Sequence, residues 1–493
     1  MYFSLPCRLY APNRHSVPYS LLPTPKLFVI KPHIVIIIPR GEAARNFVYS
    51  DTLPILAESA RVTLLSVIDD PRFTDPYRQH IESVIPIKYT PENRMLGYFR
   101  SVLHEAHFRW MDTVVARNKW ETLDAEARTT RQKVKRFAQK AAVLPVANRP
   151  ALEMLSRLEN RMTVALRNTR RYDELYRELK PDLVFNGSHI HGNASILPVR
   201  MAKHLGIPVA GFVFSWDNLT NRSRIFEPYD HYVVWHEHMR NQLLGLYPFI
   251  PAAHVHVTGT PQFDFHFKDE YVLSREELCG RIGVDPARPF ILYTTGVDRH
   301  FPDEHLHVRE VIDILHEMDP SVRPQLVVRT YVKGTSVAMK QLAAETHADV
   351  VFPPVQWEEK WFTPAYEDLS VYTSLVHHAA MSINAASTVS LEFLMFGKPV
   401  MNIGFDPPGS ALPHHLRWHR HIEFDHYAPV AASGAVMVAM SVEDMRKMIT
   451  EGLSNPEKDA QIRKEYIASV FGNTLDGQSG RRVAECLLTL AGA

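Results

Sequence analysis

Residues 381–406 read MSINAASTVSLEFLMFGKPVMNIGFD, and this order of residue types predicts a strand, a loop, a helix, a turn and a second strand. The apolar run 375–383 is expected to form the first strand. A helix is expected over 387–396, because the hydroxyl of Ser387 can accept a hydrogen bond from a backbone N–H of the first helical turn. The stretch therefore predicts one repeat of an α/β fold.

Both ends of the expected helix carry recognisable signals. Gly397 suits the position just after a helix, and Pro399 prevents the helix from continuing, so 398–403 is predicted to be the next strand. At the other end, the residues of 384–388 are small, and the first N–H groups of the helix point into this loop. A helix N-terminus in such a loop is suited to bind an anion, most often phosphate.

Glu392 lies one turn after Thr388 on the same face of the expected helix, where its carboxylate could accept hydrogen bonds from a ribose diol. The loop, the helix with Glu392 and the following Gly-Lys-Pro resemble the donor half of GT-B glycosyltransferases. They also resemble two related families, the UDP-sugar 2-epimerases and the CDP-glycerol polyol-phosphate transferases. The resemblance implies that a donor nucleotide binds here. The alternative is an ordinary βαβ unit in which Glu392 is solvated.

Segments typical of buried parallel strands alternate with helical segments along most of the chain. The expected strands, besides those above, are 32–39, 61–68, 84–87, 181–186, 207–214, 229–235, 255–264, 290–293, 325–328 and 350–352. This alternation predicts two parallel, doubly wound sheets, with a helical insertion at about 93–178 in the first domain. Together with the resemblance, it predicts an α/β fold of the GT-B-like class, in which two Rossmann-type domains face each other across a cleft.

Four parts of the chain are expected. They are an irregular N-terminal extension (1–30), a Rossmann-like acceptor domain (31–265), a Rossmann-like nucleotide-sugar donor domain (266–465) and a C-terminal segment with a helix (466–493). The Thr-Gly-Thr-Pro-x-x-Asp of 258–264 resembles the interdomain crossing of the GT-B group. The Asp-Gly-x-x-x-Arg of 476–481 resembles the tail of the epimerases and polyol-phosphate transferases. That resemblance implies that the last helix packs back on the N-terminal domain.

The composition of the chain excludes several classes of protein. Its 493 residues carry a net charge of only +1, so no overall preference for nucleic acid is expected. Residues 127–180, however, hold 14 Lys and Arg against 5 Asp and Glu, which indicates either a solvated helical face or a surface for an anionic acceptor or lipid headgroups.

The cysteine count and the apolar runs indicate in which compartment of the cell the protein is expected. Three scattered cysteines argue against a disulfide framework. No apolar run approaches the roughly 20 residues that span a bilayer, and residues 1–30 lack the continuous apolar core of a secretory signal. We therefore expect a cytoplasmic protein, with peripheral contact to the inner face of the membrane through the basic helical region as a further hypothesis.

Ligands of open α/β sheets bind at the carboxyl ends of the strands, and this rule selects candidate residues. Gly296 would permit close approach of the backbone, and Arg329 could pair with a diphosphate; the alternative for Arg329 is a structural salt bridge. The residues predicted to bind the donor nucleotide are Thr295, Gly296, Arg329, Val355, Asn384, Ser387, Thr388 and Glu392.

The strand ends of the first domain supply candidates for catalysis and acceptor binding. Inverting glycosyl transfer needs a base for the proton of the acceptor hydroxyl, and Asp217 and His191 both qualify by type. The predicted acceptor-side residues are His189, Ser215, Trp216 and Asn218. The alternative is that these polar side chains merely cap the helices that follow their strands.

No metal site is predicted. The chain has no Asp-x-Asp motif, which is the usual metal–nucleotide clamp of the other glycosyltransferase class. His415 and His419 in the histidine-rich run 413–421 have the spacing of two ligands on one helix, but Arg417 and Arg420 between them would repel a cation. The histidines are expected to edge the donor cleft or to contact an anion.

The function predicted from these features is that of a metal-independent glycosyltransferase without a cofactor. It would move a sugar from a nucleotide-sugar donor to a glycan or lipid-linked acceptor, in surface polysaccharide assembly. Three alternatives remain open, which are a CDP-polyol phosphotransferase, a UDP-sugar 2-epimerase and a non-catalytic nucleotide-binding scaffold on the same fold.

Overall fold

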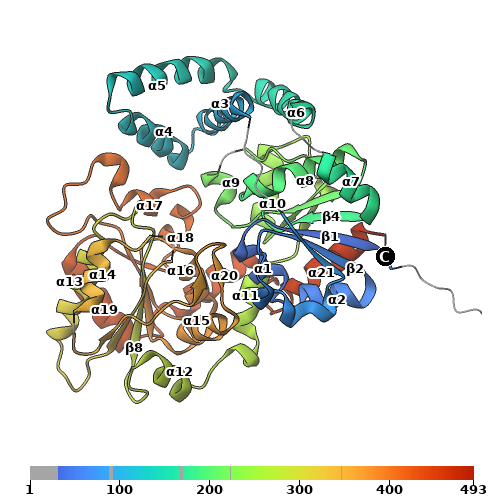
Figure 1. Cartoon of the computed structure of the whole chain (residues 1–493). Coiled ribbons are helices and arrows are strands. Elements are labelled where there is room, and N and C mark those ends of the chain that lie inside the picture. The colour runs from blue at the N-terminus through green and yellow to red at the C-terminus, as the bar shows by residue number, and fades with distance from the viewer. Residues whose placement is uncertain are drawn as a thin grey trace, which may run out of the picture. The chain divides into compact units, whose positions relative to one another are not determined.

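Two sheets of parallel strands organise the chain (Figure 1). The computed structural model describes residues 31–87, 93–166, 170–222, 224–332, 334–345 and 347–492, with only the backbone of 192–193, so the predicted extension at 1–30 lies outside the described residues. In spatial order, the strands of the first sheet are β3 (Ser83–Pro86), β2 (Arg61–Ser66), β1 (His33–Ile38), β4 (Leu183–Asn186), β5 (Val209–Phe212), β6 (His231–Val234) and β7 (Val255–Val257). Those of the second sheet are β10 (Val350–Val351), β9 (Gln325–Arg329), β8 (Phe290–Thr294), β13 (Met381–Asn384), β14 (Val400–Ile403) and β15 (Met437–Ala439).

Both sheets have the strand order of a doubly wound fold. The direction of winding changes between β1 and β4 in the first sheet and between β8 and β13 in the second, and all neighbouring strands in both sheets are parallel. The predicted pair of Rossmann-type sheets is therefore confirmed. Since ligands of such folds bind beyond the carboxyl ends of the strands at the switch point, each sheet indicates where a site is to be sought.

Helices connect the strands and cover the sheets. In chain order they are α1 (Gly41–Phe47), α2 (Thr52–Ser59), α3 (Arg94–Met111), α4 (Val114–Glu126), α5 (Thr130–Val143), α6 (Arg149–Leu166), α7 (Arg170–Leu179), α8 (Gly192–His204), α9 (Asn218–Asn221), α10 (Glu237–Leu246), α11 (Pro261–Asp264), α12 (Arg275–Ile282), α13 (Glu304–His316), α14 (Val337–Ala344), α15 (Tyr366–His378), α16 (Thr388–Met395), α17 (Arg420–Glu423), α18 (Ala428–Ala432), α19 (Val442–Ser454), α20 (Ala460–Phe471) and α21 (Ser479–Leu490). A short antiparallel hairpin, β11 (Trp357–Glu358) with β12 (Thr363–Pro364), precedes α15.

Two predicted strands are wrong in part. The predicted strand 255–264 ends at Val257, and Pro261–Asp264 form the helix α11. The other predicted strand is wrong in its first half. The apolar run 375–383 was expected to be a single strand, but α15 continues through His378 and β13 begins only at Met381. Acidic residues in the first turn of α15 and His377 with His378 in its last turn complement the helix dipole. The apolar run therefore spans the end of a buried helix and a buried strand, which periodicity alone does not separate.

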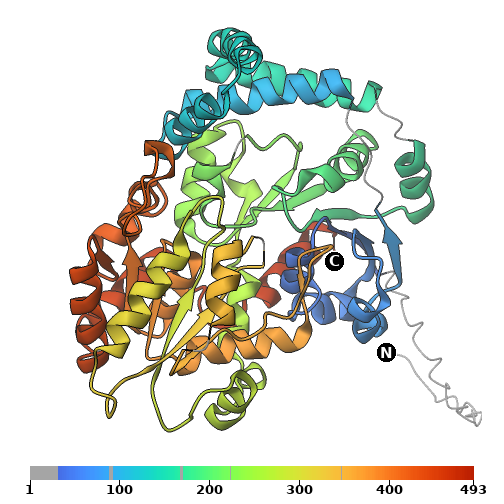
Figure 2. The same ribbon diagram turned by 60° about the vertical axis from the view of Figure 1, so that its left-hand side comes forward.

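Four helices inserted between β3 and β4 form a layer of their own. In Figures 1 and 2, α3, α4, α5 and α6 lie together outside the sheets, and α3 packs against the other three. Val102, Leu103 and Leu152 belong to the separate hydrophobic cluster of this layer. The predicted helical insertion is thus confirmed, and it has its own small core.

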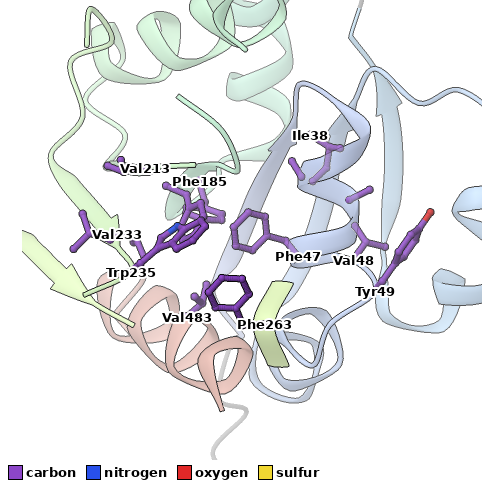
Figure 3. Packing of buried hydrophobic residues seen from close by; sticks show 14 of the residues in the cluster. Ile38, Phe47, Val48, Tyr49, Phe185, Val213, Val233, Trp235, Phe263 and Val483 are labelled. Carbon is purple, nitrogen blue, oxygen red and sulfur yellow. The ribbon is translucent and has the colours of Figure 1, made fainter. Parts of the chain in front are cut away.

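The core of the first sheet is centred on β1, whose six residues are all buried because helices cover both faces of this central strand. The ring of Phe47 on α1 packs edge-to-face against Phe185 and Phe212, with centroids 5.0 and 5.1 Å away. Figure 3 shows Val483 of α21 next to Phe263 in the same core. The last helix therefore completes the core of the first sheet.

The end of the chain also binds the segment that joins the two sheets. The buried carboxylate of Asp264 accepts hydrogen bonds from the backbone N–H groups of Ser479, at 3.1 Å, and Gly480, at 2.7 Å. Gly259 has φ +82°, and a Cβ atom there would lie 2.3 Å from Oγ of Ser479. Residues 32–493 form one compact unit, so the domain boundary expected near residue 265 stays a prediction.

Phe47→Ala is expected to lower the free energy of unfolding by about 3–5 kcal/mol, because the substitution removes a fully buried ring and leaves a cavity. Denaturant titration followed by circular dichroism measures the loss. Val337→Ala serves as the control, since Val337 is 73% exposed on α14 and its truncation is expected to change the free energy by no more than about 0.5 kcal/mol. Equal effects of the two substitutions would contradict the central role of Phe47.

Candidate functional site

A cavity of about 440 Å³ lies at the carboxyl ends of both sheets, lined by the segments that follow β1, β5, β8, β9 and β13. Its volume falls within the usual range for small-molecule sites. The predicted residues that line it are Ser215, Trp216, Asp217, Thr295, Gly296, Arg329, Ser387, Thr388 and Glu392. The cavity therefore brings together most of the residues predicted on the donor side, two of those predicted on the acceptor side, and Asp217, one of the two predicted bases.

The N-terminus of α16 opens into this cavity. Oγ of Ser387 accepts a hydrogen bond from the N–H of Val389 at 3.3 Å, so Ser387 is the N-cap that the sequence predicts. Ala386, just before it, has φ +51°, a conformation that an alanine rarely adopts and that recurs at binding sites. The loop itself therefore places no bulky side chain between the positive end of the helix dipole and the cavity.

Asn384 holds this loop from below and does not line the cavity. Its Oδ1 accepts hydrogen bonds from the N–H of Ser387 at 3.1 Å and from Oγ of Ser390 at 3.0 Å. Nδ2 of Asn402 on β14 donates to the same atom at 3.0 Å. These bonds pin the backbone ahead of α16, so the predicted contact of Asn384 with a ligand is replaced by support of the loop.

Glu392 is buried at the cavity wall, so it is not the solvated carboxylate of the alternative interpretation. The hydroxyl of Tyr372 donates a hydrogen bond to Oε2 of Glu392, and Nε2 of His266 lies 3.8 Å from the same oxygen. Burial raises the pKa of Glu392 to about 7 and lowers the pKa of His266 to about 3, so that the imidazole is neutral. A carboxyl group with such a pKa at a cavity wall is typical of a functional site.

Only part of the Arg329 guanidinium takes part in a salt bridge within the protein. Nη2 donates to Oδ2 of Asp368 at 2.6 Å, which is the salt bridge that the sequence left open as an alternative. Nη1 is buried and has no hydrogen-bond partner among the described residues. The same holds for Oγ1 of Thr294 and Nδ1 of His266, which also line the cavity. Buried polar atoms without partners are uncommon in native proteins, and all three belong to residues that line the cavity.

The opposite wall is formed by the segment after β5. Asp217 accepts hydrogen bonds from the side-chain amides of Asn218, at 3.2 Å, and Asn221, both of which lie on α9. Nε1 of Trp216 donates to Oγ1 of Thr388 at 3.1 Å. This hydrogen bond joins the acceptor-side segment directly to the helix terminus on the other wall.

Three predicted residues of the first domain do not line the cavity. His189 is buried beneath the β5 segment, where its Nδ1 accepts from the N–H of Phe214 at 3.3 Å and burial lowers its pKa to about 4. Nδ1 of His191 lies 2.7 Å from Oγ of Ser188. Oδ1 of Asn218 accepts from the N–H of Ser215 at 3.0 Å, a bond within the loop ahead of α9, and no side chain among the described residues caps the N-terminus of α9. Val355, predicted on the donor side, also lies outside the lining, between β10 and β11.

Several residues of the cavity escaped the sequence analysis. Arg45 on α1 donates from Nη2 to Oε1 of Gln262 at 2.5 Å, and burial lowers the pKa of its guanidinium. Arg45 lies shortly after the carboxyl end of β1, so the rule that ligands bind at the carboxyl ends of strands could have selected it. Tyr372 and His426 also line the cavity, but they lie on α15 and in the loop before α18, where no local signal marks them.

Within the described part of the chain, no group of three or more His, Cys, Asp or Glu side chains is arranged to hold a metal ion. His415 lies in a short 3-10 turn and His419 precedes α17, so the two do not share a helix as their spacing suggested. His414 instead contacts Glu121 of α4 at 3.0 Å.

Comparison with solved structures identifies the fold. The putative UDP-N-acetylglucosamine 2-epimerase from Listeria monocytogenes is 12% identical, with a TM-score of 0.53 over 93% of this chain and 96% of that chain. The S. aureus MnaA–UDP co-structure is 11% identical, with a TM-score of 0.52 over 94% and 98%. The UDP-GlcNAc 2-epimerase from Neisseria meningitidis bound to UDP-GlcNAc is 11% identical, with a TM-score of 0.51 over 93% and 99%. No protein-family model and no curated protein sequence matches the chain. These structures confirm the predicted GT-B-like fold. Sequence identities this low show the similarity of fold alone.

Glu392→Gln is expected to stabilise the protein at pH 8. A carboxyl whose pKa is near 7 when folded and 4.5 in the unfolded chain contributes stability that is fully present below pH 4.5 and is lost as the pH rises through 7. Glutamine can still accept from Tyr372 but does not titrate. The variant should therefore exceed the native protein by up to about 3 kcal/mol at pH 8, with the difference shrinking toward pH 5.

Urea unfolding at the two pH values measures this difference. Glu443→Gln, at an exposed carboxylate of α19, is the matched control. A difference between Glu392→Gln and the native protein that does not change with pH would show that Glu392 is not a strained, buried acid.

Proposed function

We propose that this protein is a metal-independent glycosyltransferase that moves a sugar from a nucleotide-sugar to a hydroxyl group of a glycan or lipid-linked acceptor. The observation that carries the proposal is that the N-terminus of α16, Glu392 and Arg329 open into the same cavity as Asp217. The helix N-terminus, Glu392 and Arg329 suit the binding of a nucleoside diphosphate. Asp217 suits the role of the base that takes the proton of the acceptor hydroxyl.

The donor would lie against the second sheet. Its phosphates would bind at the N-terminus of α16, where backbone N–H groups and the helix dipole favour negative charge. Nη1 of Arg329, which lacks a partner among the described residues, would neutralise the diphosphate, and the carboxylate of Glu392 would accept hydrogen bonds from the ribose diol. Solved structures of the same fold carry UDP and UDP-GlcNAc in their names, which supports a uridine nucleotide as the first ligand to test.

Transfer needs one base and one stabilised leaving group. Asp217 would take the proton of the acceptor hydroxyl while the hydroxyl oxygen bonds to the anomeric carbon. The bond between that carbon and the phosphate oxygen breaks, and the nucleoside diphosphate leaves with the electron pair. Arg329 and the N-terminus of α16 would stabilise the charge that develops on the leaving oxygen, a role that a metal fills in other enzymes. His191, the other predicted base, lies outside the cavity lining, which favours Asp217.

A UDP-sugar 2-epimerase is the second candidate, because two of the solved structures compared above carry that name. That activity needs several carboxylates near the sugar ring and no acceptor. Four carboxylates line the cavity, but Asp368 is bound by Arg329 and by Nε1 of Trp357, at 2.8 Å, and Glu392 is bound by Tyr372. The products separate the two candidates, since an epimerase converts a UDP-sugar without any acceptor and a transferase releases UDP only when one is present.

A nucleoside diphosphate is expected to raise the melting temperature of the native protein in the presence of EDTA, because the site supplies its own positive charge. Glu392→Ala should weaken the binding of the nucleotide about tenfold, since hydrogen bonds to a charged group are lost. Thermal-shift titration with UDP, GDP, CDP, ADP, dTDP and CMP measures both effects. Glu345→Ala, at an exposed residue just after α14, is the control.

Unchanged nucleotide affinity in a folded Glu392→Ala variant would show that Glu392 does not bind the ribose diol. Loss of binding on chelation, restored by a divalent ion, would overturn the metal-independent site. A response confined to CMP and CDP would favour the polyol-phosphate alternative.

Asp217→Asn is expected to reduce turnover at least about 100-fold, as loss of a general base does, while the dissociation constant for the nucleotide changes little. The substitution keeps the shape of the side chain and its place at the start of α9. His191→Gln is the matched control and should keep most of the activity. Full activity of Asp217→Asn in an acceptor-dependent assay would exclude Asp217 as the base.

A further inference from the structure

The helix α5 exposes an apolar stripe on its outer side. Val134 is 64% exposed, Phe137 is 75% exposed, and Leu144, directly after the helix, is 56% exposed. Spacings of three and seven residues place these side chains on one face of a helix, and Ala138 and Ala141 lie between them. The opposite face carries Gln139 and Val143 and is buried against the rest of the helical layer. We call the exposed face, Val134 to Leu144, the α5 surface.

The charged residues of α5 itself are all positive. Arg131, Lys133 and Lys135 are exposed, and α5 contains no Asp or Glu. The other two basic residues of the helix turn toward acidic partners in the layer, since Arg136 binds Asp124 at 2.7 Å and Lys140 binds the same carboxylate at 2.6 Å. Asp124 is thus paired with basic residues on the inner side of α5, and Arg131, Lys133 and Lys135 keep their positive charge on the helix surface.

The neighbouring helix α6 shows the same combination. Met154 and Leu158 are exposed and lie four residues apart, and Arg157 and Arg161 are exposed on the same side. Nine of the sixteen large hydrophobic side chains that are exposed among the described residues lie in 95–166. Exposed apolar residues scattered singly need no explanation, but their concentration in the basic helical layer indicates an interaction surface.

We propose that the α5 surface docks on an anionic lipid bilayer. A helix with an apolar stripe and flanking lysines and arginines lies in the plane of the headgroups, with its apolar side chains at the boundary of the acyl chains. The basic residues add attraction to anionic headgroups. An acidic protein partner would complement the charges alone, whereas the bilayer complements both the charges and the apolar stripe.

The docking is peripheral. No helix within the described ranges is long and apolar enough to cross a membrane. In Figures 1 and 2, α5 lies on the outer side of the helical layer, away from both sheets. The inference does not rest on the proposed reaction, because lipid binding is measured without donor, acceptor or turnover.

Co-sedimentation of the full chain with vesicles tests the proposal. We expect the protein to bind vesicles of phosphatidylcholine mixed with phosphatidylglycerol, to bind pure phosphatidylcholine vesicles weakly, and to lose affinity when the salt concentration is raised. Phe137→Asp should weaken binding about tenfold or more, because it replaces an inserted ring by a charge that anionic headgroups repel. Replacement of Lys133 and Lys135 by Glu should have a similar effect.

Val337→Asp is the matched control, since Val337 is 73% exposed on α14 in the second half of the chain. Its vesicle binding should equal that of the native protein, and the melting temperatures of all variants should agree. No binding to anionic vesicles at low salt, or equal binding by Phe137→Asp, would overturn the proposal. So would self-association that Phe137→Asp abolishes in the absence of vesicle binding.

Discussion

The contact between Asp264 and the N-terminus of α21 ties the segment that joins the two sheets to the last helix of the chain. A buried carboxylate accepts two backbone N–H groups at the positive end of a helix, and burial raises its pKa to about 6. Beside it, Nε of Arg482 donates to the carbonyl oxygen of Thr258 at 2.8 Å. The crossing segment and the end of the chain therefore fix each other. Because α21 completes the core of the first sheet and α20 packs against α16 and α10, the helix that opens into the cavity is tied to the first sheet through the tail.

The fold was predictable where local chemistry and tertiary structure agree. The β-branched run of β1 is buried along its whole length, and Ser387 caps α16 as its side chain suggests. The prediction failed where apolar residues run from α15 into β13, because burial on all sides removes the periodicity that distinguishes a helix from a strand. The contact of Asp264 with the tail joins residues more than two hundred positions apart, and only the resemblance to a family pointed to it.

The candidate site was predictable through one rule of sheet topology, which places ligands at the ends of strands. The rule found Asp217, Thr388 and Arg329, all of which line the cavity. It cannot tell which side chains after a strand turn outward, so it also selected His189, which lies beneath the loop with its ring bonded to the backbone. It cannot reach Tyr372 either, because this residue enters the cavity from the middle of a helix whose position depends on the whole second sheet.

The hydrogen bond from Trp216 to Thr388 makes the two walls of the cavity thermodynamically dependent on each other. An anion that took a hydrogen bond from the hydroxyl of Thr388 would share this residue with the indole of Trp216, which belongs to the segment that carries Asp217. A ligand on one wall that moved either partner of this bond would change the free energy of binding on the other wall. By linkage such an effect is reciprocal, so the factor by which one ligand alters the affinity for a second equals the factor in the opposite direction. A single side-chain contact thus joins the two walls of the cavity.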